Sequence, residues 1–215
     1  MQKPMIQIAL DHRDLKSAIG AVANVSSFVD IIEIGTILAF SEGVCAVSTL
    51  REKYPGHIIV CDLKTTDGGK ILSQMAFEAG AHWLTVSAAA HPATMAACCS
   101  IAAKFGGEIQ VEIYGNWSMR DAEKWVEMGI KQAIYHRSRD AETAGVSWKE
   151  EDVKKMRQLS DIGLELSITG GIIPEEVHFF KGLRVKAFIA GRALSGENGY
   201  RAAEALRRKI DYFWS

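Results

Sequence analysis

The sequence has no excess of charge of either sign and no apolar run long enough to span a bilayer. Its 25 basic and 26 acidic residues leave a formal net charge of −1, which gives no long-range attraction to nucleic acid or to an anionic membrane. A transmembrane helix needs roughly 20 consecutive apolar residues. We therefore expect no nucleic-acid or membrane partner, and an anionic substrate would have to be recognised locally.

The few cysteines lack the spacing of a metal site or a redox motif. Cys45, Cys61, Cys98 and Cys99 form no Cys-x-x-Cys pair, and no histidine stands beside them at zinc-ligand spacing. The chain runs from Met1 directly into a strand-like segment, without the apolar core of a signal peptide. We expect reduced thiols that serve packing, in a cytoplasmic protein.

Apolar, β-rich runs alternate along the chain with segments of helical periodicity. Strands are expected at 5–10, 29–34, 58–61, 83–86, 109–113, 132–135, 164–168 and 185–189, and helices at 14–25, 69–79, 93–104, 118–128, 149–159 and about 195–212. Strand starts recur at about the length of one βα unit. This pattern predicts an α/β protein, a single-domain (β/α)8 TIM barrel over residues 1–215. A doubly wound open sheet is the alternative, but no Gly-x-Gly-x-x-Gly follows the first strand.

Polar side chains follow the ends of most predicted strands. In a (β/α)8 barrel the active site lies at the C-terminal ends of the strands. The candidates, in chain order, are Asp11, Glu33, Asp62, Lys64, Glu112, His136, Arg139 and Thr169. One such residue is easily explained as a solvated loop group, but their recurrence at the same end of the barrel favours a functional site.

The third predicted strand ends in Asp62-Leu63-Lys64-Thr65-Thr66-Asp67. Side chains alternate along a strand, so Asp62 and Lys64 should point to the same face. A purely structural interpretation is a salt-bridged strand end, with Asp67 as the N-cap of the next helix.

Glu33 and Asp62 come from neighbouring strands, so both carboxylates can face one hard cation. Magnesium binds through one or two carboxylates and keeps waters that substrate oxygens can replace. A magnesium site is therefore favoured, although the two carboxylates could instead share a proton or pair with Lys64.

Two glycine-rich turns follow the last two predicted strands, Thr169-Gly170-Gly171 and Ala190-Gly191-Arg192. Loops at these places form the usual phosphate site of the barrel. Glycine allows backbone N–H groups to approach phosphate oxygens, and Arg192 could add charge-assisted bonds. A phosphorylated small molecule is favoured over glycines that serve only tight turns.

The segment from Asp62 to Asp67 also matches the Asp-x-Lys-x-x-Asp motif of the orotidine 5′-monophosphate decarboxylase superfamily. Residues 30–36, 115–117, 135–140 and 188–192 fit one branch of it, and the chain resembles the 3-keto-L-gulonate 6-phosphate decarboxylase family from about residue 5 to past residue 192. Glu33 stands where the orotidine enzyme has a lysine, as in the metal-dependent branch.

The resemblance implies an activity, a cofactor and an assembly. The activity is loss of CO2 from 3-keto-L-gulonate 6-phosphate to give L-xylulose 5-phosphate through an enediolate, in L-ascorbate or related sugar-acid catabolism. The cofactor is Mg2+, and the assembly is a homodimer with active sites at its interface.

The resemblance also implies a role for each candidate residue. Glu33 and Asp62 would hold the metal, Lys64 would stabilise the enediolate, and Asp67 would orient Lys64 from across the dimer interface. Glu112, His136 and Arg139 would serve protonation of the intermediate. Asp11 would bind a substrate hydroxyl, and Thr169, Gly170, Gly171, Gly191 and Arg192 would hold the phosphate end.

Two alternatives remain open on sequence grounds. Thr65-Thr66 resembles the sister enzyme 3-hexulose-6-phosphate synthase, which adds formaldehyde to ribulose 5-phosphate, whereas Arg139 favours the decarboxylase. Gly68-Gly69 replaces an expected alanine-glycine pair without removing a functional group. The more distant alternative is a non-catalytic sugar-phosphate-binding protein on the same fold.

Overall fold

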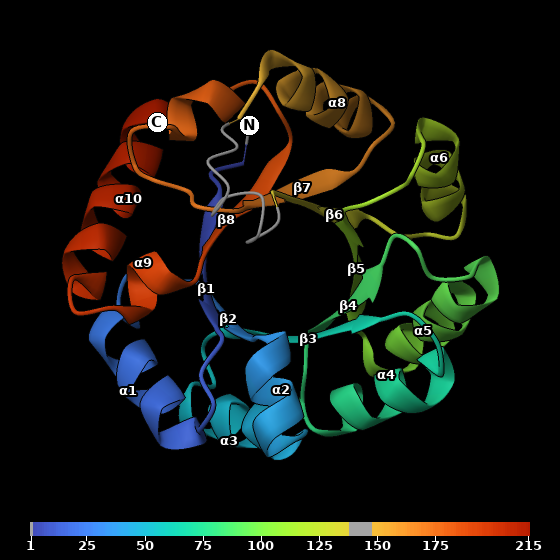
Figure 1. Ribbon diagram of the computed structural model, residues 1–215, viewed down its shortest axis with the longest axis horizontal. Coiled ribbons are helices and arrows are strands. Elements are labelled where there is room, and N and C mark those ends of the chain that lie inside the picture. The colour runs from blue at the N-terminus through green and yellow to red at the C-terminus, as the bar shows by residue number, and fades with distance from the viewer. Residues whose placement is uncertain (1, 138–147) are drawn as a thin grey trace.

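The computed structural model describes residues 2–137 and 148–215 and confirms the predicted (β/α)8 barrel (Figure 1). All strands are parallel and pair in chain order, and β8 pairs with β1 to close the ring. The strands are β1 (Met5–Leu10), β2 (Ile31–Ile34), β3 (Ile58–Thr65), β4 (Trp83–Ser87), β5 (Glu108–Ile113), β6 (Gln132–His136), β7 (Glu165–Thr169) and β8 (Val185–Ala190).

The helices surround the ring of strands (Figure 1). They are α1 (Leu15–Val25), α2 (Thr36–Glu42), α3 (Cys45–Lys53), α4 (Gly69–Glu78), α5 (Pro92–Phe105), α6 (Met119–Glu127), α8 (Glu150–Asp161), the 3-10 helix η1 (Val177–Phe180), α9 (Arg192–Ser195) and α10 (Gly199–Phe213). No described helix is long and apolar enough to cross a membrane. Ser118 and Asp121 form a reciprocal capping box at the start of α6.

Two expected helical features differ from the structure. The closing helix does not run from residue 195, because α9 ends before Gly196 and α10 begins only at Gly199. A Cβ on Gly199 would collide with the carbonyl oxygen of Leu194, so the two helices meet closely at a glycine. Asp67 is not the N-cap of α4, since that position is Gly68, with φ of 64° and no side-chain cap bond.

The cysteines only partly fit the expectation of packing thiols. Cys61 and Cys98 are buried, and burial raises the pKa of their thiols to about 12 and about 11. Cys99 is half-buried, but Cys45 is exposed on α3 and therefore contributes little to packing.

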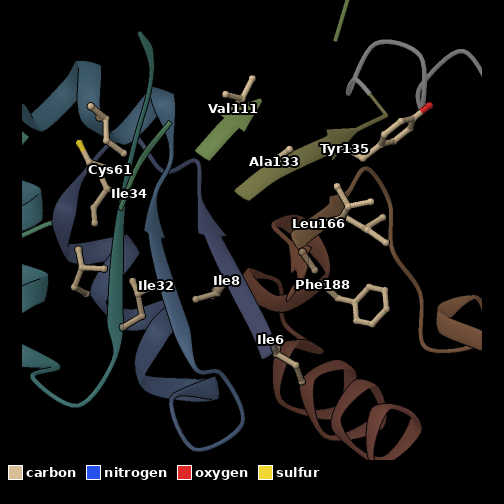
Figure 2. Packing of buried hydrophobic residues seen from close by; sticks show 14 of the residues in the cluster. Ile6, Ile8, Ile32, Ile34, Cys61, Val111, Ala133, Tyr135, Leu166 and Phe188 are labelled. Atoms are coloured by element: carbon tan, nitrogen blue, oxygen red, sulfur yellow. The ribbon is translucent and has the colours of Figure 1, made fainter. Parts of the chain in front are cut away.

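The main hydrophobic core lies between the strands and the helices. Alternate residues of each strand point outward into it, for example Ile6 and Ile8 of β1, Ile32 of β2 and Phe188 of β8, all fully buried (Figure 2). Burying a large aliphatic or aromatic side chain stabilises the fold by roughly 1.5–3 kcal/mol. This outer core holds the barrel together and leaves its interior available for polar side chains.

The inward-pointing side chains form layers across the barrel, each with four residues from alternate strands, as is typical of this fold. Gln7 pairs with Ile31, and the next residue, Ile32, pairs with Ile59. Crossing from each strand to its pairing partner and then moving one residue toward the C-terminus passes through Val60, Gln110 and Ser167 and returns to Gln7. These four side chains therefore lie in one layer.

The same pairing defines three layers of inward-pointing side chains. The middle layer is Gln7, Val60, Gln110 and Ser167; the upper layer is Glu33, Thr85, Ile134 and Ile189; and the rim layer is Ala9, Asp62, Glu112 and Thr169. Below them a small apolar cluster that includes Ile31, Trp83 and Ala187 fills the barrel. Each of the three layers above this cluster therefore contains polar side chains, and the acids Glu33, Asp62 and Glu112 lie in the upper and rim layers.

Candidate functional site

A cavity of about 700 Å³ opens at the C-terminal ends of the strands. The predicted site residues that line it are Asp11, Glu33, Asp62, Lys64, Glu112, His136, Thr169, Gly170, Gly171, Gly191 and Arg192. Side chains from strand ends far apart in the sequence thus meet in one place, as the barrel requires.

Asp62 accepts hydrogen bonds at both of its carboxylate oxygens. Its Oδ2 accepts from Lys64 Nζ at 2.6 Å and from Thr36 Oγ1 at 2.7 Å, and its Oδ1 accepts from Thr85 Oγ1 at 2.6 Å. These donors fix the orientation of the carboxylate, whose two oxygens both accept hydrogen bonds. Asp62 and Lys64 do meet, as strand alternation predicted, but the backbone between them is irregular. Lys64 has a φ of 46°, and the β3–β4 register shifts between Cys61 and Thr65.

Lys64 lies between two carboxylates. Its Nζ is 2.6 Å from Asp62 Oδ2 and 3.0 Å from Glu112 Oε2. Burial lowers the pKa of Lys64, but the charges of Asp62, Glu112 and Glu33 outweigh it, and the pKa is raised above its ordinary value. Lys64 is therefore a fixed positive charge, unsuited to accept a proton near neutral pH.

Glu33 lies one layer below Asp62 and is only 6% exposed. Its Oε2 accepts a 2.7 Å hydrogen bond from Gln7 Nε2. Burial, followed by the negative charge of Asp62, raises the pKa of Glu33 well above its usual range, against the opposing effect of Lys64. A buried carboxylate with a raised pKa gains stability from a cation beside it.

The donor set fits a magnesium ion bound by few protein groups. Glu33 and Asp62 offer hard carboxylate oxygens from adjacent strands, and both line the cavity. Within residues 2–137 and 148–215 no group of three or more His, Cys, Asp or Glu side chains is arranged around a metal position. A metal here would therefore take its remaining ligands from water or substrate, as magnesium commonly does.

His136 and Glu112 form the second polar pair at the rim. His136 Nδ1 lies 2.5 Å from Glu112 Oε1, and the ring of Tyr114 contacts the imidazole edge-on at 6.2 Å between ring centroids. If the bond is Nδ1–H to carboxylate, Nε2 is the nitrogen left to exchange a proton with a ligand. Glu112 thus contacts both His136 and Lys64.

The glycine-rich turn after β7 is fixed by a residue that the sequence interpretation did not single out. Arg137 donates from Nε to the carbonyl oxygen of Gly170 at 2.9 Å, and its guanidinium lies 4.8 Å from the ring centroid of Trp148. Gly170 has a φ of 109°, and a Cβ there would collide with the carbonyl oxygen of Arg137. The turn therefore needs glycine both for its conformation and for space.

Two predicted residues are not placed with the others. Asp67 is exposed beyond the end of β3 and is absent from the described lining of the cavity, so within one chain it does not orient Lys64. Arg139 lies outside the described residues.

Three further residues shape the site, namely Gln7, Thr36 and Thr85, which bond the two candidate metal ligands. Gln7 and Thr85 could have been identified from the sequence, because each is a polar residue between apolar neighbours, in Met5–Leu10 and in Trp83–Ser87 respectively. Thr36 begins α2, where no pattern indicated a contact with Asp62.

Known proteins resemble this chain over its full length. A probable 3-keto-L-gulonate-6-phosphate decarboxylase from Haemophilus influenzae is 55% identical over 224 residues, with all of both chains covered. The crystal structure of 3-keto-L-gulonate-6-phosphate decarboxylase from Vibrio cholerae is 64% identical, with full coverage of both chains and a TM-score of 0.95. KGPDC from Streptococcus mutans, solved in complex with a sugar phosphate, is 40% identical over all of both chains, with a TM-score of 0.96.

The family model described as "Orotidine 5'-phosphate decarboxylase / HUMPS family" matches residues 4–207. That span contains every strand of the barrel and every predicted site residue. The chain belongs to the orotidine 5'-phosphate decarboxylase / HUMPS family.

Proposed function

We propose that this protein is a magnesium-dependent carboxy-lyase that converts 3-keto-L-gulonate 6-phosphate to L-xylulose 5-phosphate. The observation that carries the proposal is the ammonium of Lys64, held between Asp62 and Glu112 in a cavity that also contains the glycine-rich turns. Relatives named 3-keto-L-gulonate-6-phosphate decarboxylase support the choice of substrate.

The reaction breaks the carbon–carbon bond to the carboxylate, releases CO2 and leaves the bonding electron pair on the substrate as an enediolate. Glu33 and Asp62 would hold a magnesium ion, which when bound would supply Lewis-acid stabilisation of negative charge on substrate oxygens. Lys64 adds a fixed positive charge, and Asp62 and Glu112 hold that charge in place before the reaction starts.

The enediolate must then gain a proton on carbon. His136 suits this step because imidazole changes charge near neutral pH, and Glu112 orients the ring through Nδ1. We propose that His136 Nε2, directly or through a water, delivers the proton. Arg139 is proposed to assist this step on the basis of the sequence resemblance.

The substrate's phosphate is proposed to bind at Thr169, Gly170, Gly171, Gly191 and Arg192, which line one part of the cavity. Arg137 supports this subsite by holding the carbonyl oxygen of Gly170. Asp11, packed closely against Gly35, is proposed to bind a substrate hydroxyl.

We also propose a homodimer in which Asp67 completes the partner's site. Asp67 is exposed, and α4 beside it carries the exposed apolar side chains Ile71 and Met75. On α2, Phe40 is 85% exposed. Apolar side chains of this size are typical of buried contact surfaces between subunits. A cytoplasmic location and a role in L-ascorbate or related sugar-acid catabolism remain predictions.

The deciding experiment measures CO2 release from 3-keto-L-gulonate 6-phosphate with Mg2+ and then with EDTA. Release that EDTA abolishes and Mg2+ restores is expected. Absence of release, together with condensation of formaldehyde and ribulose 5-phosphate, would identify the synthase reaction instead. Binding of sugar phosphate without turnover of either substrate would identify a non-catalytic binding protein.

A further inference from the structure

The middle layer of the barrel is polar although it is closed to solvent. Gln7 on β1, Gln110 on β5 and Ser167 on β7 are each 0% exposed. They share this layer with Val60 and lie directly beneath the layer that contains Glu33. A buried polar group destabilises the fold unless it forms a hydrogen bond, so each polar atom of these side chains is expected to have a partner.

The amide nitrogens of both glutamines are engaged. Gln7 Nε2 donates to Glu33 Oε2 at 2.7 Å, and Gln110 Nε2 donates to Gln132 Oε1 at 3.0 Å. Gln132 in turn donates to Glu108 at the bottom of the barrel. Ionised Glu33 and Glu108 accept but do not donate, so with both acids ionised these bonds fix which atom of each amide is nitrogen.

Three polar atoms of the middle layer remain. Among the described residues, no protein atom hydrogen-bonds to Gln7 Oε1, Gln110 Oε1 or Ser167 Oγ, and all three are buried. All three belong to one four-residue layer, whose members point toward the barrel axis from strands spaced around it. They comprise two carbonyl acceptors and one hydroxyl that can donate.

We propose that the middle layer binds one water molecule that donates to Gln7 Oε1 and Gln110 Oε1 and accepts from the Ser167 hydroxyl. The two hydrogens and one lone pair of water match these three groups, and buried waters typically make about three hydrogen bonds. Through Gln7, this water fixes the orientation of the Glu33 carboxylate. Gln7, Gln110 and Ser167 are thus positioning residues.

The effect on metal binding rests on the proposed function, in which Glu33 is a magnesium ligand. The presence of the water does not depend on that function. Hydrogen-bonded groups behind a metal ligand restrict its rotation and raise the affinity of the site for its ion. Gln7 holds one oxygen of Glu33 from below, on the side opposite the opening of the cavity.

A crystal structure of the unmodified protein at better than about 1.5 Å resolution tests the water directly. We expect a density peak with three contacts of about 2.7–3.1 Å to the named atoms. An unoccupied layer would overturn the proposal. So would contacts near 2.4 Å, which indicate a sodium ion, or reversed amide orientations.

The positioning role is tested by Mn2+ binding, followed by electron paramagnetic resonance without substrate. Gln7→Met and Gln110→Met remove the same atoms from the same layer, but only Gln7 contacts Glu33. We expect the Mn2+ Kd to rise about 10- to 100-fold in Gln7→Met. Gln110→Met, which also loses the bond to Gln132, and the smaller change Ser167→Ala reach Glu33 only through the water and should raise the Kd about two- to fivefold.

Unchanged Mn2+ affinity in a folded Gln7→Met protein would refute the positioning role. Equal losses in Gln7→Met and Gln110→Met would do the same, because they would indicate general disruption of the layer. If the unmodified protein bound no Mn2+, the proposed metal site would be wrong, while the crystallographic test would still decide the water.

Discussion

The ammonium of Lys64 lies 3.0 Å from Glu112 Oε2, a carboxylate that also contacts His136 through its other oxygen. The residue proposed to stabilise negative charge and the residue proposed to deliver a proton are therefore held by one side chain. This arrangement joins the two halves of the proposed reaction, loss of CO2 and protonation, at a single acid of the rim layer.

Replacing Lys64 with methionine keeps much of the side-chain volume but removes the charge. We expect kcat for CO2 release to fall by about 10²- to 10³-fold, the usual effect of removing one preorganised electrostatic group. The fold should persist, as checked by circular dichroism, because the outer core is untouched. Lys209→Met, at an exposed position of α10 that is not part of the proposed dimer surface, is the control and should retain activity. Wild-type turnover in Lys64→Met would exclude the proposed role.

Subunit mixing tests whether Asp67 acts across a dimer interface. Asp67→Ala and Lys64→Ala should each be inactive, but a heterodimer of the two contains one intact composite site. Random mixing should therefore restore about a quarter of wild-type activity, as expected for a two-fold dimer. The control mixes Lys64→Ala with Glu33→Ala. Each of these changes inactivates the site of the chain that carries it, so both sites of the heterodimer are defective and the mixture should restore no activity. Equal behaviour of the two mixtures would contradict the shared site.

Gly170→Ala should weaken binding of the phosphate end. The added Cβ meets the Arg137 carbonyl oxygen, and a φ of 109° disfavours alanine. We expect KM for the phosphorylated substrate to rise about tenfold or more, which corresponds to ~1.4 kcal/mol. Gly163→Ala is the matched control, because its φ is 106° but its surroundings are open. Gly163→Ala should lower the stability of the fold without changing KM. A similar KM in both variants would contradict the proposed role of the Gly170 turn in phosphate binding.

His82 should make the stability of the fold depend on pH. Burial, followed by the charge of Arg51, lowers the pKa of His82, and its Nδ1 accepts a 2.8 Å hydrogen bond from the backbone N–H of Ile59. The folded protein therefore favours neutral imidazole, and its stability is complete above the ordinary histidine pKa of about 6.5. Stability is lost as pH falls from there through the lowered pKa, because the unfolded chain binds the proton more readily.

Urea denaturation between pH 8 and pH 5 measures this effect. The unfolding free energy of the wild type should decrease toward pH 5 more steeply than that of His82→Gln. At pH 8 the variant should be less stable by about 1 kcal/mol, since the bond to Ile59 is lost. Parallel pH profiles for the two proteins would show that His82 does not titrate as expected.

Much of the barrel was predictable because its signals are local. Strand-length apolar runs at regular spacing predicted the eight strands, and acids and hydroxyls at their ends predicted which residues would line the cavity. Alternation also predicted that Asp62 and Lys64 would meet. The positive φ of Lys64 was not predictable, because it depends on a register shift against the neighbouring strand.

The remaining features depend on contacts between distant segments. The bond from Arg137 to Gly170 joins residues 33 positions apart, and neither sequence context indicates it. The three unpartnered atoms of the middle layer emerge only once the register has placed Gln7, Gln110 and Ser167 at one height. Arg139 was a candidate because it follows the sixth predicted strand, but its role came only from the resemblance to the family.

Closure of the sheet has a consequence for how the protein meets its neighbours. Each strand from β1 to β8 is hydrogen-bonded on both sides, so the sheet presents no unpaired edge. An unpaired edge is the usual template for strand addition and aggregation. A second copy can therefore associate only through helices and loops, so side-chain identity on those surfaces, rather than backbone pairing, decides which molecules it recognises.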